Sequence, residues 1–203
     1  KPVVAVVVAE GEIVGGRQEP GTIGGESTSA LIRAARADRN VRAIVLRVDS
    51  PGGEVYAAEQ IRREVQLARE AGKPVIVSMG DVAASGGYWI SMDADRILAE
   101  PDTITGSIGI FGLFFTAPNG LDKLGIHTGG VGTTPIAGAF DIRRPLDPAV
   151  GNMIQSVIDK GYRDFVGGVA RARGKSFADV NAIAQGRVWS GAQALQRGLV
   201  DRL

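Results

Sequence analysis

Residues 74–89 read Pro-Val-Ile-Val-Ser-Met-Gly-Asp-Val-Ala-Ala-Ser-Gly-Gly-Tyr-Trp. The first six residues form an apolar, β-branched run, which is typical of a buried strand. Only alanine and glycine flank Ser85, so another backbone can approach this serine closely. A serine at a strand-to-helix turn also lies at a helix N-terminus, where free N–H groups favour negative charge. Ser85 is therefore our candidate nucleophile.

Strand and helix patterns alternate on both sides of this stretch. Further strands are expected at residues 3–9, 41–48 and 96–99, and helices at residues 27–37 and 54–71. Such alternation implies an α/β fold with a parallel sheet and right-handed βαβ crossovers. The glycine-rich turns 49–53 and 81–87 both follow strands. We therefore expect them at the carboxyl edge of the sheet, where sites lie in such folds.

The second half of the chain is more helical. A short helix is expected over residues 121–125 and a long one over residues 148–173. Two shorter helices follow, opened by the capping residues Ser176 and Ser190, and Gly198 ends the last of them. We interpret this region as a C-terminal helical extension of the sheet. Because no repeat or low-complexity linker interrupts the chain, we expect one domain over residues 1–203.

Composition excludes several kinds of chemistry. The net charge of +1 gives no reason to expect a nucleic-acid partner. The absence of cysteine excludes disulfides, thiol catalysis and cysteine-based metal sites. No Walker A loop or dinucleotide fingerprint occurs, so no cofactor or metal is expected. The apolar run 3–9 is too short to span a bilayer and indicates a buried strand. Because the chain starts abruptly in strand-like sequence, we expect it to be a fragment of a longer protein.

A serine nucleophile needs an oxyanion hole and a general base. The backbone N–H groups of Gly53 and Gly86 could form the hole if the two glycine-rich turns face each other. The alternative reading is that both are tight turns with helix caps. The single histidine, His127, follows Ile126 on an expected strand, which is more typical of a structural role than of a base.

A lysine base requires desolvation, which lowers its pKa from about 10.4 toward neutrality. The lysines are Lys1, Lys73, Lys123, Lys160 and Lys175. Lys73 precedes a strand and is expected at the wrong edge of the sheet, and the others give no convincing base. Asp49 and Asp81 could form a paired-carboxylate site, but an aspartate before Ser-Pro-Gly more often caps a turn.

Four segments, in order along the chain, resemble motifs of the signal peptide peptidase A family, also called protease IV. They are Asp49–Gly53, Ala83–Tyr88, Ile104–Ser107 and the tail Gly186–Asp201. Each motif is weak alone, but together they are specific and cover almost the whole chain. The resemblance implies a Clp/crotonase-like fold. It also implies a membrane-associated serine endopeptidase of the Ser/Lys dyad type that degrades cleaved signal peptides.

The same resemblance implies roles for individual residues. Ser85 would be the nucleophile, Gly53 and Gly86 would donate the oxyanion hole, and Ser107 would orient the lysine. The apolar segment 108–115 would border a groove for the hydrophobic cores of signal peptides, although core packing is the alternative reading. The family also implies a homo-oligomer at the bacterial inner membrane, with its catalytic domain on the extracytoplasmic side.

The catalytic lysine is where this sequence departs from the family. Short-form members carry it in a segment ending in Asp-Ile, which here reads Gly138-Ala139-Phe140-Asp141-Ile142, with Phe140 in its place. Long-form members are tandem duplications in which the N-terminal half supplies the lysine and the C-terminal half the serine. This chain resembles the C-terminal half. We therefore expect an N-terminal half domain as partner, and no activity from the 203 residues alone.

Two other functions are compatible with these residues. A crotonase-like acyl-CoA enzyme would use paired N–H groups to hold a thioester enolate and would not need Ser85. A non-catalytic assembly domain would keep the serine only as a vestige. A Clp-type protease is disfavoured, since it would need a histidine closer to Ser85 than His127 is.

Overall fold

The computed structural model describes residues 1–134 and 136–203. The chain divides into two compact units. The larger unit contains Lys1–Gly109 and Asp164–Leu203, and the smaller contains Ile110–Arg163. That residues 1–203 act as one catalytic domain stays a prediction.

A six-stranded sheet forms the centre of the larger unit. Its order is β1–β4–β5–β7–β8, and β6 also pairs with β5. The strands are β1 (Val3–Glu10), β4 (Val41–Ser50), β5 (Val75–Ala84), β6 (Arg96–Leu98), β7 (Ile104–Gly106) and β8 (Val188–Ser190). A separate parallel pair is formed by β2 (Ile13–Val14) and β3 (Ile23–Gly24). All pairs in the large sheet are parallel except β7 with β8. The predicted α/β fold with a parallel sheet is confirmed.

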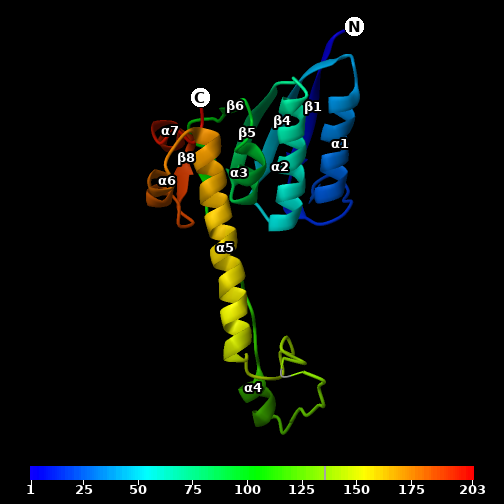
Figure 1. Cartoon of the computed structure of the whole chain (residues 1–203), viewed down its shortest axis with the longest axis vertical. Coiled ribbons are helices and arrows are strands. Elements are labelled where there is room, and N and C mark those ends of the chain that lie inside the picture. The colour runs from blue at the N-terminus through cyan, green and yellow to red at the C-terminus, as the bar shows by residue number, and fades with distance from the viewer. Residues whose placement is uncertain (135) are drawn as a thin grey trace. The chain divides into compact units, whose positions relative to one another are not determined.

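Helices α1 (Gly25–Ala37), α2 (Val55–Glu70) and α3 (Gly86–Ser91) pack against the strands on the β1–β5 side of this sheet. Figure 1 shows α1 and α2 side by side along the sheet. Ile44, Leu46 and Val48 alternate along β4 and are fully buried. This period of two is that of a strand with one covered face. Burying each such side chain contributes about 1.5–3 kcal/mol to the stability of the fold.

The prediction that residues 3–9 form a buried strand is only half right. The strand is present as β1, but Val4, Val6 and Val8 are exposed, whereas Val7 and Ala9 are buried. The reason is position, because β1 lies at the edge of the sheet and only one of its faces is covered within the chain.

The end of one strand differs from the sequence prediction, and four short strands, β2, β3, β7 and β8, were not predicted. The strand expected to end at Met79 continues to Ala84, because its last residues pair with β7. Glycine, aspartate and alanine have low strand propensity, so no local pattern indicates this extension. The turn therefore begins at Ser85 itself. Strand β8 was not predicted, and its antiparallel pairing makes the sheet mixed.

The expected C-terminal helices are present as α5 (Pro148–Arg173), α6 (Phe177–Ile183) and α7 (Gly191–Gln196). The Ser176 hydroxyl accepts a hydrogen bond from the backbone N–H of Asp179 (3.0 Å) and so caps α6. Ser190 and Gln193 form a reciprocal capping box at the start of α7. These hydrogen bonds satisfy backbone donors that a helix start leaves free.

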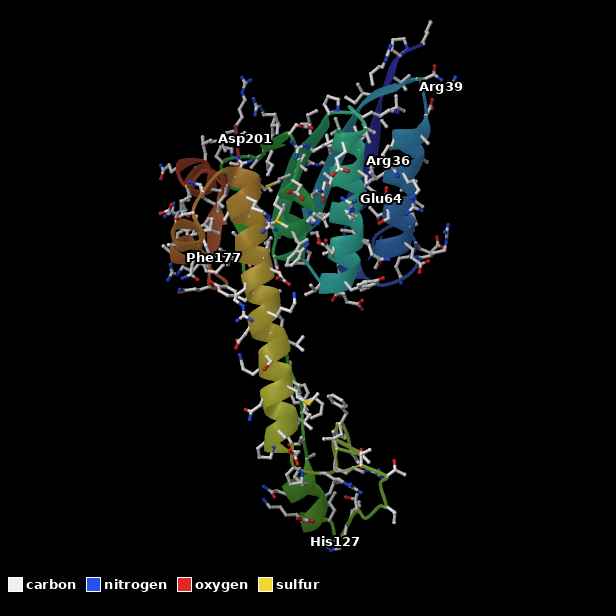
Figure 2. The ribbon with its side chains drawn as sticks, in the orientation of Figure 1. Arg36, Arg39, Glu64, His127, Phe177 and Asp201 are labelled. Carbon is white, nitrogen blue, oxygen red and sulfur yellow. The ribbon has the colours of Figure 1, made fainter. Side chains whose placement is uncertain are left out.

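Asp201, labelled in Figure 2, connects the end of the chain to α5 and β6. Its carboxylate accepts hydrogen bonds from the Arg173 guanidinium (2.7 and 3.2 Å) and from the backbone N–H of Ile97 (2.7 Å). Burial tends to raise the pKa of this carboxyl. The hydrogen bonds from Arg173 and Ile97 outweigh burial, and the pKa lies below its ordinary value of 3.8.

We expect Asp201→Asn to lower the free energy of unfolding by about 1.5–3 kcal/mol at neutral pH. Because the folded-state pKa is depressed, the stabilisation by ionised Asp201 is present above the ordinary value. It is lost as the pH falls through the lower folded-state value. Urea denaturation of both proteins at about pH 7 and about pH 2.5 measures this. A difference between the two proteins that stays the same at both pH values would contradict the prediction.

The smaller unit contains α4 (Pro118–Lys123), the loop after it and the first part of α5. The helix predicted over residues 121–125 starts earlier, at Pro118, and Gly125 follows its end with a φ of 71°. The prediction of a strand around His127 is wrong. His127 lies in an irregular loop, where several glycines follow it and no strand partner occurs in the described residues.

Candidate active site

Ser85 stands at the junction of β5 and α3. Its φ of 54° and ψ of −117° lie outside the regions that side-chain-bearing residues favour. The Ser85 N–H donates a hydrogen bond to the Gly106 carbonyl oxygen (2.9 Å), and its carbonyl oxygen accepts one from the Trp89 N–H (2.8 Å). These two bonds hold the strained turn. Ser85 occupies the N-cap position of α3, but its side chain makes no capping hydrogen bond.

The turn after β4 lies directly against the Ser85 turn. A Cβ atom at Gly52 would lie 2.7 Å from the Gly86 nitrogen and 2.8 Å from the Ser85 Cβ. A Cβ atom at Gly86 would lie 3.1 Å from the Gly53 nitrogen. The close approach therefore requires glycine. The two turns therefore face each other, as an oxyanion hole formed by the N–H groups of Gly53 and Gly86 requires.

The N–H groups of Gly53 and Gly86 are both free of partners. Within residues 1–134 and 136–203, neither donates a hydrogen bond. The next residue along, Glu54, differs, since its N–H bonds to the Ile13 carbonyl oxygen (2.8 Å). The Gly86 N–H belongs to the first turn of α3, where helical geometry offers no acceptor. Two unpaired donors on facing turns are what a developing oxyanion requires.

Ser107 lies beside the Ser85 turn. Ala84 and Gly106 are paired across β5 and β7, so the two serines each follow one member of this pair. Ser107 also has a left-handed backbone, with a φ of 49°. Its N–H donates a hydrogen bond to the Arg187 carbonyl oxygen (2.8 Å), and this bond supports the strained residue.

The larger unit offers no lysine as a base for Ser85. Lys1 and Lys73 precede β1 and β5, which places them at the amino edge of the parallel sheet, opposite Ser85. The Lys73 ammonium group donates hydrogen bonds to the carbonyl oxygens of Ala35 (2.9 Å) and Asp38. Lys175 lies next to Gly198, where an added Cβ would be 3.1 Å from its Nζ. The remaining lysines, Lys123 and Lys160, belong to the smaller unit.

The other candidate bases are placed as follows. His127, labelled in Figure 2, lies in the smaller unit, is 77% exposed and has its Nδ1 3.2 Å from Asp122. Asp49 accepts a hydrogen bond from the Val82 N–H (3.1 Å), and Asp81 is exposed. Asp49 therefore binds backbone, as a capping aspartate does. No cluster of three or more possible metal ligands occurs among the described residues.

The apolar segment after Ser107 falls on both units. Ile108 is buried in the larger unit, whereas Phe111, Leu113 and Phe115 are exposed in the smaller one. Phe140, at the position where short-form relatives would carry lysine, packs edge-on against Phe114 with ring centroids 5.8 Å apart. The smaller unit also holds an apolar cavity of about 330 Å³, lined in part by Ile136, Phe140, Met153 and Ile154.

Sequence reasoning missed two backbone acceptors of the site. The carbonyl oxygens of Gly106 and Arg187 hold the backbones of Ser85 and Ser107. No side chain carries this role, so no residue type marks it. Both acceptors depend on how β7 is placed against its neighbours, including β8. That pairing joins segments far apart in the sequence, so no local pattern shows it.

A solved structure has the same fold. The chain resembles a mutant form of ClpP1 from Listeria monocytogenes with a TM-score of 0.63 and 19% identity, covering 97% of this chain and 89% of that one. This likeness concerns the fold alone. The parallel sheet and the strained strand-to-helix turn at Ser85 define a domain with a Clp-like fold.

The family follows from the sequence comparisons. The model of peptidase family S49 matches residues 67–203, which is more than half of the chain. The chain belongs to this family. It is 51% identical over 200 residues to "Protease 4" of Salmonella typhi, and 46% identical over 200 residues to "Protease 4" of Haemophilus influenzae. Each alignment covers 98% of this chain.

The chain spans 32% of the length of each of these two relatives. In the described part of the chain, none of the helices combines the length and apolar character needed to cross a bilayer.

Proposed function

We propose that this chain is the serine-bearing part of an endopeptidase, with Ser85 as the nucleophile. The observation that carries the proposal is the pair of free N–H groups at Gly53 and Gly86, on two turns in contact beside Ser85. A carbonyl oxygen placed between these donors would gain negative charge during attack, and preorganised donors stabilise that charge without rearranging.

The reaction follows from this arrangement. The Ser85 oxygen attacks the carbonyl carbon of the scissile amide, a C–O bond forms, and the hydroxyl proton passes to a general base. The oxyanion is held by the N–H groups of Gly53 and Gly86. The C–N bond then breaks as the base returns the proton to the leaving amine. Water attacks the acyl-enzyme by the same route, which releases the acid and restores the hydroxyl.

A lysine from outside these 203 residues is our proposed base. No lysine of the larger unit is placed to reach Ser85, and Phe140 stands where short-form members carry theirs. An N-terminal half domain, as in long-form members of the signal peptide peptidase A family, would supply it. Ser107, in the position next to the paired Gly106, would orient the lysine amine.

Hydrophobic peptides, and cleaved signal peptides in particular, are the proposed substrates. The motif resemblance to signal peptide peptidase A supports this assignment. The exposed apolar side chains of the smaller unit, Phe111, Leu113 and Phe115, also support it, because they offer contact area to an apolar peptide. The family resemblance also implies a homo-oligomer and a location on the extracytoplasmic side of the bacterial inner membrane. Both belong to this proposal.

Fluorophosphonate labelling of the full-length protein tests this function. We expect one modified serine, identified as Ser85 by peptide mass spectrometry, and complete loss of labelling and peptidase activity in Ser85→Ala. Ser156→Ala is the matched control. Among the described residues, the Ser156 hydroxyl donates its hydrogen bond to the Asn152 carbonyl oxygen of the same helix, so this variant should behave as the unchanged protein.

Two results would overturn the proposal. Labelling elsewhere, with Ser85 unmodified, would favour a non-catalytic assembly domain. Binding of acyl-CoA measured by calorimetry, unaffected by Ser85→Ala, would favour a crotonase-like enzyme that uses the same N–H pair for a thioester enolate.

A further inference from the structure

Strand β5 changes its pairing register with β4 just before Ser85. Val48 pairs with Met79, but the next paired residues are Ser50 and Ala83. One residue of β4, Asp49, thus stands opposite three residues of β5, numbers 80–82. In regular pairing Ser50 would face residue 81 instead. The bulge therefore displaces β5 by two residues, which is roughly 6–7 Å along the strand.

Asp49 holds one side of this bulge. Its Oδ1 accepts a hydrogen bond from the Val82 N–H (3.1 Å), a donor that the interrupted ladder leaves without its regular partner. Gly80 gives the carboxylate its space, because a Cβ there would lie 2.8 Å from the Asp49 carboxyl carbon and Oδ2. The aspartate and the glycine therefore fit together as a unit.

Thr103 holds the other side. Its hydroxyl donates a hydrogen bond to the Gly80 carbonyl oxygen (2.8 Å) and accepts one from the Glu100 N–H (3.0 Å). Thr103 is 1% exposed, so water cannot take over these bonds in its absence. A buried carbonyl left without a donor would favour a different path for the backbone.

We propose that Asp49 and Thr103 are positioning residues for the nucleophile. By fixing the bulge they set how far β5 extends past β4, and so bring the Ser85–Gly86 turn into contact with Gly52 and Gly53. Neither residue touches the reacting atoms. The inference rests on the proposed function, because it assigns the bulge a part in the reactivity of Ser85.

The rate of fluorophosphonate labelling at Ser85, in the full-length protein, measures this role. Thr103→Val keeps the shape and removes the hydroxyl, and Asp49→Ala removes the acceptor. We expect each to slow labelling by about 10- to 100-fold, because small displacements of a reacting group have effects of that size. Thr103→Ser and Asp49→Asn keep the hydroxyl and the acceptor oxygen. We expect both to label at nearly the original rate.

Ser176→Ala is the control for a general loss of stability. It removes a helix cap far along the chain from the bulge, and should lower the melting temperature without slowing the labelling. Labelling at the original rate in both Thr103→Val and Asp49→Ala would overturn the inference. Equal slowing in Thr103→Val and Thr103→Ser would also overturn it, since the hydroxyl would then not matter. No labelling of Ser85 in the unchanged protein would instead overturn the proposed function.

Discussion

Gly53→Ala is expected to slow the labelling of Ser85 by about 100-fold or more, the usual effect of losing an oxyanion-hole donor. It should also lower the free energy of unfolding by about 3 kcal/mol. The added Cβ would lie 2.0 Å from the Ile13 carbonyl oxygen, which is backbone and cannot rotate away. The φ of 151° at this position adds strain for any residue with a Cβ. Relief of the clash must move the Gly53 backbone, whose nitrogen lies beside Gly86.

Gly129→Ala is the matched control for this prediction. An added Cβ at Gly129 meets nothing within 4 Å, and its backbone does not adopt a positive φ. Thermal denaturation and labelling rates of both variants should therefore separate an effect of the site from a general effect of glycine replacement. Unchanged stability and unchanged labelling in Gly53→Ala would show that the turn has a different geometry.

The isolated 203-residue chain is expected to hydrolyse peptides at least about 10³-fold more slowly than the full-length protein. General-base catalysis accounts for about 10²–10⁴-fold in rate, and the larger unit places no lysine at Ser85. Lys73, the lysine that comes just before β5, is committed to the carbonyl oxygens of Ala35 and Asp38. Lys73 is therefore not available as the base.

Peptide turnover by the isolated chain and by the full-length protein measures this difference, with Ser85→Ala in each as the background. Circular dichroism confirms that the isolated chain is folded during the assay. Turnover by the isolated chain at the full-length rate, abolished by Ser85→Ala, would show that the base lies within these residues.

The sequence predicted the parts of the fold whose pattern is local. The strands at residues 41–48 and 74–79 were indicated by runs rich in valine, isoleucine and leucine, a composition that favours strands and lies within each segment itself. The helices that Ser176 and Ser190 open carry side-chain caps, which a sequence displays directly.

Features that depend on distant pairing could not be predicted in this way. Strand β8 has three residues and becomes a strand only through its pairing with β7. The exposed face of β1 is apolar, so the sequence pattern does not distinguish it from a covered face.

The candidate site was likewise predictable only where its features have a local sequence pattern. Small residues around Ser85 and the glycine-rich turn ending at Gly53 indicated two close backbones, and the structure places the two turns in contact. The hydrogen bond from Thr103 to Gly80 could not be foreseen, because nothing in the local sequence Asp102-Thr103-Ile104-Thr105 indicates that this hydroxyl meets a backbone carbonyl 23 residues earlier. The catalytic roles of Ser85, Gly53, Gly86 and Ser107 stay predictions.

The hydrogen bond between the Ser107 N–H and the Arg187 carbonyl oxygen has a consequence for the order of folding. It joins two segments with three helices, α4, α5 and α6, between them. Closing so long a loop is slow compared with helix formation, because its entropic cost comes before any contact is gained. The surroundings of Ser85 are therefore expected to form late, once β7 and β8 have paired.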